Sequence, residues 1–349
     1  MKNWHKAIGA SLMLLSIAAC GGGAPSGGGT PATSGTVNGY SVDPADATKA
    51  AKLSVSGLDS SNNVIKSGTI TDTNVPLTSI TVARRVVQTV AAYVPTQVNS
   101  VPCGPITGQS GSVAAALTLD STGSMASTDP PSTAGDTTTT KRNIAAKLFV
   151  DRMAATDIAA VSSFDTDTTK TSPYLAIKLW QTFSSSKPTL KTGIDSATFA
   201  GGSTNLWDAA FDSTNLVESR TETNKVGIIL TDGVDNSSSK TPANVISNAT
   251  AKTVRLFMIG LSTSSSPLSS AAISNMSNVA NSTGGVFAIA SDAASLSNTF
   301  NGVFNATQGA GCVKINFVPV PPSGVLIKGS LSMKINGGAA ITAPFTIQY

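Results

Sequence analysis

Three short polar segments of the chain carry the residues best suited to chemistry. The first contains Asp120, Thr122 and Ser124, the second contains Thr204, and the third contains Asp232. Together they offer two carboxylates and three hydroxyls. These hard oxygen donors suit Mg²⁺, which we expect first, or Mn²⁺ or Ca²⁺, and they bind zinc poorly. Because Mg²⁺ prefers octahedral coordination and keeps waters, such a set would leave a position open for a further ligand.

The residue types that are scarce in the chain exclude several classes of catalysis. His5 is the only histidine, and it lies in a segment that we expect to be removed. The remaining chain would then have no Ser-His-Asp or Cys-His catalysis and no histidine metal ligand. Lys and Arg number 23 against 19 Asp and Glu, and they form no basic run, so we expect no nucleic-acid binding. We therefore expect a binding protein and not an enzyme.

Between residues 112 and 309, apolar strands alternate with helical patterns. Strands are predicted at 113–119, 158–164, 174–183, 226–230, 254–261 and 286–290. Helices are predicted at 141–155, 206–216, 242–252, 271–280 and 293–304. Unbroken apolar strands between helices indicate an α/β fold, a doubly wound and mostly parallel sheet with helices on both faces. Ligands bind such sheets at the carboxyl ends of the strands, which is where the polar segments fall.

The three polar segments resemble the metal-ion-dependent adhesion site (MIDAS) of the von Willebrand factor type A family, which includes integrin I domains. The family pattern is Asp-x-Ser/Thr-x-Ser, then a Thr on a second loop and an Asp on a third. Asp120, Thr122 and Ser124 match the first part, Thr204 the second and Asp232 the third. Thr122 stands where Ser is commoner, and it keeps the hydroxyl.

The resemblance implies coordination and not catalysis. The hydroxyls would bind the metal directly, aspartates would act partly through water, and an Asp or Glu carboxylate of a partner protein would complete the shell. The first hypothesis is therefore a divalent-cation-dependent protein-binding or adhesion module. The alternative is a structural or envelope-assembly component, in which the metal only stabilises the domain and the flanks make the contacts. Family members can also shift their last helix, here 293–304.

The N-terminus predicts a lipoprotein signal peptide over residues 1–19. An apolar run at 7–19 follows two lysines and is too short to span a bilayer. It ends in Ile17-Ala18-Ala19-Cys20, which resembles the bacterial lipobox; an ordinary signal peptide with a chance cysteine is the alternative. Residues 20–35 are rich in Gly, Ser and Pro, which predicts a flexible tether. We expect a membrane anchor at Cys20, in the outer membrane if the source is Gram-negative, facing the periplasm or the surface.

The flanks of the central region, residues 36–111 and 310–349, are predicted to form β structure. The second flank is too short to fold alone, so we expect one β-sandwich from both flanks with the α/β domain inserted. Cys103 and Cys312 bracket that domain, and the expected compartment permits a disulfide between them; two buried thiols are the alternative. Trp207 fits either a contact beside the metal loop or packing of its own helix.

Overall fold

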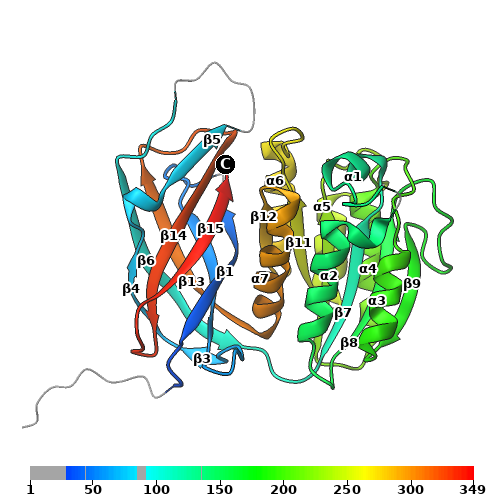
Figure 1. Ribbon diagram of the computed structural model, residues 1–349, viewed down its shortest axis with the longest axis horizontal. Coiled ribbons are helices and arrows are strands. Elements are labelled where there is room, and N and C mark those ends of the chain that lie inside the picture. Colours follow the sequence, from blue (N-terminus) through cyan, green and yellow to red (C-terminus); the bar gives the residue numbers. More distant parts are fainter. Residues whose placement is uncertain (1–28, 44, 85–91, 135) are drawn as a thin grey trace, which may run out of the picture.

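The computed structural model describes residues 29–43, 45–84, 92–134 and 136–349. The predicted signal peptide and Cys20 lie outside these residues. A β-sandwich and a layered α/β unit lie side by side, at the left and right of Figure 1. Within the described residues no helix is both long enough and apolar enough to cross a membrane.

The α/β unit is built on strands whose residues are buried on both faces. In sheet order the strands are β12 (Phe287–Ala290), β11 (Arg255–Leu261), β10 (Asn224–Thr231), β7 (Val113–Asp120), β8 (Ile158–Phe164) and β9 (Ile177–Ser184). Only the edge strand β9 is antiparallel to its neighbour, β8. All eight residues of β7 are buried, as the unbroken apolar sequence predicts for a central parallel strand. The predicted doubly wound fold is thus confirmed.

Helices cover both faces of this sheet. They are α1 (Gly123–Thr128), α2 (Lys141–Arg152), α3 (Lys187–Ser196), α4 (Leu206–Glu218), α5 (Pro242–Ala251), α6 (Ser270–Ser282) and α7 (Leu296–Gln308). Helix α2 packs against α3 and α7, and α5 packs against α4 and α6. The sequence did not predict α3, because its Ser, Thr and Gly content hides a short apolar stripe made by the buried Leu190 and Ile194.

Both flanks of the chain contribute to both sheets of the sandwich. In the first sheet β1 (Ser34–Val42), β2 (Ala51–Leu58), β3 (Ser67–Gly68) and β6 (Gln97–Gly108) are joined by β13 (Gly309–Val318). In the second sheet β4 (Ile70–Asn74) and β5 (Thr81–Arg84) both pair with β14 (Val325–Ile335), which also pairs with β15 (Ile341–Gln348). The expected single sandwich is therefore present. A disulfide joins Cys103 on β6 to Cys312 on β13, with a Cα–Cα distance of 5.0 Å.

The sandwich and the α/β unit share one sheet, which the sequence did not predict. Strand β1 pairs antiparallel with β12 through Tyr40 and Phe287, and this pairing makes a continuous eleven-stranded sheet. The two aromatic rings meet edge to face at 5.4 Å. The hydroxyl of Tyr40 also donates to the carbonyl oxygen of Gln348 at 3.0 Å, which brings in the C-terminal strand.

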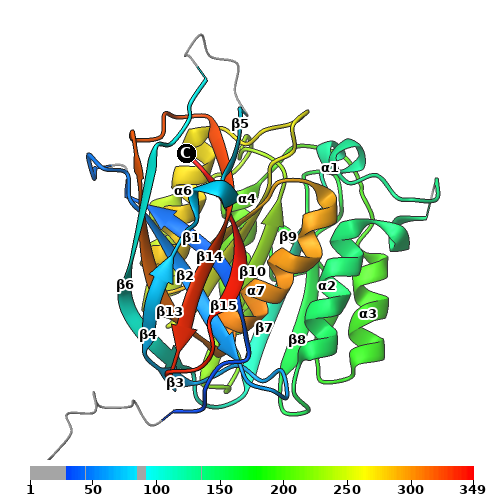
Figure 2. The same cartoon turned by 60° about the vertical axis from the view of Figure 1, so that its left-hand side comes forward.

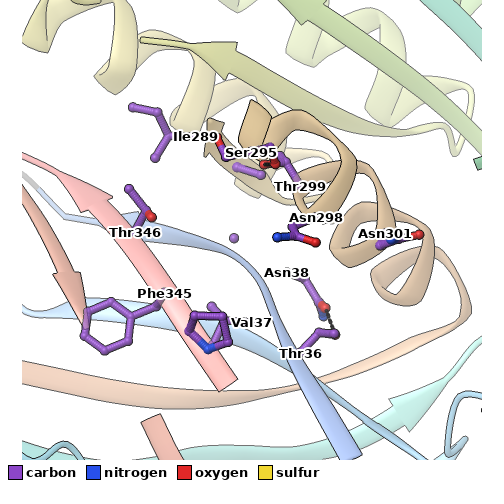
Figure 3. A pocket seen from close by; sticks show the side chains of 13 residues that line it. Thr36, Val37, Asn38, Ile289, Ser295, Asn298, Thr299, Asn301, Phe345 and Thr346 are labelled. Carbon is purple, nitrogen blue, oxygen red and sulfur yellow. Dashed lines mark hydrogen bonds between the residues drawn. The ribbon is translucent and has the colours of Figure 1, made fainter. Parts of the chain in front are cut away.

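Polar contacts join the last helix of the α/β unit to the sandwich. Helix α7 lies between the sandwich and α2 (Figures 1 and 2). The amide of Asn305 on α7 donates to Thr36 Oγ1 at 2.8 Å, and Thr36 donates in turn to Asn38 at 2.8 Å. A cavity of about 350 Å³ lies beside this contact, between α7, β1 and β15 (Figure 3).

Candidate metal site

The carboxyl ends of two neighbouring strands bring the predicted acidic residues together. Strands β7 and β10 are parallel and in register, with Leu119 opposite Leu230. Asp120 ends β7 and Asp232 follows β10, so both carboxylates lie at the same edge of the sheet. Both side chains are buried, at 0% and 4% exposure.

Hydrogen bonds link the first and third polar segments. Thr122 donates to Asp120 Oδ1 from its backbone N–H at 2.8 Å and from its hydroxyl at 2.6 Å. The hydroxyls of Thr122 and Ser124 lie 3.1 Å apart, and Ser124 donates to Asp232 Oδ1 at 2.8 Å. A continuous line of oxygen atoms therefore runs from one carboxylate to the other.

The second polar segment meets the third one through Thr204. A Cβ placed on Gly233 would lie 3.1 Å from Thr204 Oγ1, so this hydroxyl lies directly beside the loop that carries Asp232. The backbone N–H of Thr204 donates to Asn236 Oδ1 at 2.9 Å, and the N–H of Asn236 donates to the Thr204 carbonyl at 3.0 Å. The structure thus gathers all five residues that the sequence singled out.

The electrostatics of the site favour the arrival of positive charge. Burial and the nearby charge of Asp232 together raise the pKa of Asp120 to about 6, against the hydrogen bonds from Thr122 and Thr231. Burial also raises the pKa of Asp232, against the hydrogen bond from Ser124. Both shifts mean that the ionised carboxylates are poorly compensated by the protein itself.

One oxygen of the site has no partner in the part of the chain that the structure describes. Asp232 Oδ2 is buried and accepts no hydrogen bond there. A buried carboxylate oxygen normally has a partner, because its desolvation is costly otherwise. An unpaired carboxylate oxygen among three hydroxyls and a second carboxylate fits a hard divalent cation.

Two residues that support the site were not predicted. Thr231 donates to Asp120 Oδ2 at 2.6 Å and accepts the N–H of Gly233 at 3.1 Å, so it fixes both strand ends. In the sequence, Thr231 stands directly before Asp232, and this position could have indicated its supporting role.

The second of these residues, Arg142, is fully buried on α2. Its guanidinium donates to the carbonyl oxygens of Asp120 and Ala197, and it lies 4.4 Å from the ring centroid of Phe199. Burial lowers its pKa to about 10, while Asp129 and Asp120 oppose that shift. Arg142 therefore ties the first loop to the segment that leads into the second. In the sequence it follows Lys141 and resembles a residue of a solvated helix face.

The chain is similar to several proteins of solved structure. Among solved structures, the chain is similar to proximal thread matrix protein 1 from the mussel byssus, with 23% identity and a TM-score of 0.45 over 64% of this chain and 50% of that one. The mussel protein with a zinc-occupied MIDAS motif is 24% identical, with a TM-score of 0.46 over 62% of this chain and 49% of that one. A von Willebrand factor type A protein from Catenulispora acidiphila is 13% identical, with a TM-score of 0.46 over 79% of this chain and 74% of that one.

The chain thus spans about half the length of the mussel protein chains. No curated protein matches it in sequence. The family model of the von Willebrand factor type A domain matches residues 117–302, more than half of the 349 residues and the whole of the strand edge described above. The chain therefore belongs to the von Willebrand factor type A domain family.

Proposed function

We propose that this protein is a divalent-cation-dependent binding module that takes up an acidic side chain of a partner protein. The observation that carries the proposal is the buried, unpaired Oδ2 of Asp232 within a set of oxygen donors, in the part of the chain that the structure describes. Mg²⁺ is the first candidate cation, with Mn²⁺ and Ca²⁺ as alternatives, because the donors are carboxylates and hydroxyls.

The residues that would hold the cation are Asp120, Thr122, Ser124, Thr204 and Asp232. When bound, the cation supplies a positive centre that a partner carboxylate can ligate. Ser124 is exposed, whereas Asp120, Thr122, Thr204 and Asp232 are buried. A partner would therefore approach over the start of α1, where the site opens to solvent.

We also propose that a lipid on Cys20 anchors the protein in a membrane, which is the outer membrane if the source is Gram-negative. The support for this is the apolar run before Cys20 and its lipobox-like ending. The segment between Cys20 and the start of β1 at Ser34 is rich in Gly, Ser and Pro, and its length would let the binding face reach partners at some distance from the bilayer.

The proposal is tested by thermal melting of the purified protein with Mg²⁺, Mn²⁺ or Ca²⁺ against a chelator. A cation that binds only the native state stabilises it by about 2–3 kcal/mol at roughly 100-fold excess over Kd. We expect this rise in midpoint for the wild type and its loss in Asp120→Ala, Thr204→Ala and Asp232→Ala. Asp59→Ala is the control, because Asp59 is a partly exposed turn residue of the sandwich.

The same samples are then passed over immobilised polyglutamate and polyglutamine. Retention on polyglutamate alone, dependent on the cation and lost in the three site variants, supports the proposed function. A wild type that melts at the same temperature with cation and with chelator would refute the metal site. A cation-dependent midpoint without retention would favour the alternative, in which the metal only stabilises the fold and the β flanks make the contacts.

A further inference from the structure

A small niche, lined by five apolar side chains and by Gly233, Asp235 and Asn275, lies directly beside the candidate metal site. It has a volume of about 80 Å³ and lies between the start of α4, the loop after β10 and the first turns of α6. Its apolar walls come from Leu206, Trp207, Val234, Ala272 and Met276. Gly233 also lines it, and Gly233 is the residue whose Cβ would touch Thr204 Oγ1. The niche and the metal site therefore share one wall.

Trp207 lines the niche, and it carries an indole N–H that the fold does not use. The side chain is only 6% exposed. Its backbone N–H donates to Ser238 Oγ at 3.0 Å, but its indole Nε1 makes no hydrogen bond within the described ranges and is not sealed from solvent. A largely buried indole normally finds a partner for its N–H, so this donor is available to a ligand.

The rim of the niche disfavours a negatively charged side chain of a ligand. Val234, half-exposed at 50%, stands at the mouth, and Asp235 lies beside it. The Asp235 carboxylate already accepts the hydroxyl of Ser238 at 2.5 Å, so it needs no partner from a ligand. A second acidic side chain placed here would be repelled, whereas an uncharged apolar one would bury surface against Met276 and Trp207.

We propose that this niche receives a small aliphatic side chain next to the acidic residue of the partner, and that the Trp207 indole donates a hydrogen bond to the partner's backbone. The inference rests on the proposed function of the metal site. A space of about 80 Å³ is larger than the ~30 Å³ of one water and smaller than the ~150 Å³ cavity that holds benzene, which suits a valine-sized group. The partner motif is thus an acid with a branched aliphatic residue one or two positions away.

The test uses the purified full chain and an array of hexapeptides with a central Glu, in which the flanking positions carry Val, Ile, Ser or Asp. In Mg²⁺ we expect binding to be about five- to tenfold stronger with Val or Ile at one flank than with Ser, and weakest with Asp there. Ala272→Leu fills the niche and is expected to remove this preference. Ala271→Leu, at an exposed position of the same helix, is the matched control and is expected to keep it.

Trp207→Phe keeps an aromatic ring and deletes the N–H, so it is expected to weaken the preferred peptide by about threefold or more. This variant carries the test if Ala272→Leu does not fold. The cation-dependent rise in melting midpoint reports on the metal site separately, and its absence in the wild type would refute the proposed function. With that rise present, peptides that bind without any flank preference, or a preference that survives Ala272→Leu, would overturn the niche. No peptide binding at all would instead refute the proposed uptake of an acidic side chain.

Discussion

The decisive feature among single residues is a pair of buried carboxylates whose charges the protein compensates only in part. Asp120 is held by Thr122 and Thr231, whereas one oxygen of Asp232 has no partner within the described residues. The folded state therefore holds a proton on Asp120 more tightly than the unfolded state does, since its pKa lies at about 6 against an ordinary value of 3.8. Such poorly compensated groups destabilise the folded protein, but they favour the binding of a ligand that compensates them.

Asp120→Asn is expected to stabilise the metal-free protein at neutral pH. Because the folded pKa is raised, the native state of the wild type binds more protons than the unfolded state, and its stability falls as pH rises from about 4 to about 6. The stability of the variant does not fall in this way, because Asn does not titrate. Its amide can also donate to Thr231 Oγ1. In chelator, the free energy of unfolding of the variant should exceed that of the wild type at pH 7 by on the order of 2 kcal/mol, and the gap should close by pH 4.

Urea unfolding at several pH values measures that gap, and the variant should at the same time lose the cation-dependent rise in midpoint. A variant that is less stable than the wild type in chelator at pH 7 would contradict this account of Asp120.

Among the elements, the junction of β1 with β12 decides how the sandwich and the α/β unit are joined. The pairing is short, so its stability depends on how closely the backbone of β1 approaches β12. Gly39 permits this approach, because a Cβ there would lie 2.2 Å from the carbonyl oxygen of Phe287. The register shift of β1 between Val37 and Gly39 places this glycine at the contact.

Gly39→Ala is therefore expected to lower the free energy of unfolding by roughly 1–3 kcal/mol, since backbone must move to admit the methyl group. Gly104→Ala is the control, because its Cβ would make an ordinary contact of 3.5 Å with Cys312. Urea unfolding of the two variants beside the wild type measures the difference. Equal free energies of unfolding for the two variants would contradict this prediction, because they would show that β1 and β12 can move apart without loss of stability.

In the whole molecule, the α/β unit is inserted in a sandwich that both chain flanks build. The chain enters it from β6 and returns into β13, and the N–H of Gln109 donates to the carbonyl of Gln308 at 2.8 Å where the two connections meet. The Cys103–Cys312 disulfide joins these same two strands, across a sequence separation of 209 residues. The bridge therefore holds together the two strands through which the chain enters and leaves the α/β unit.

Reduction of this disulfide is expected to lower the melting midpoint, because the bridge restricts the unfolded chain, with a typical contribution of about 2–4 kcal/mol. The double variant Cys103→Ala/Cys312→Ala should melt near the reduced wild type and should not respond to reductant. Calorimetry with and without reductant measures both. An unchanged wild-type midpoint under conditions where free thiols are detected would contradict a stabilising role.

The α/β fold and the candidate site residues could both be predicted from the sequence alone. Unbroken apolar strands such as 226–230 can bury all their side chains only in a sheet that is covered on both faces. Short oxygen-bearing side chains that follow such strands then lie at the carboxyl edge of the sheet. These properties are local in the chain, so the pattern of residue types is enough to reveal them.

Features that depend on contacts between distant segments became visible only in the folded structure. The buried Arg142 beneath Asp120, the pairing of Tyr40 with Phe287 and the niche beside Trp207 each need atoms from segments far apart in the sequence. Nothing in the residue types of those segments fixes which of them meet. Their meeting is settled by how the whole core packs, and that packing exists only once the chain has folded.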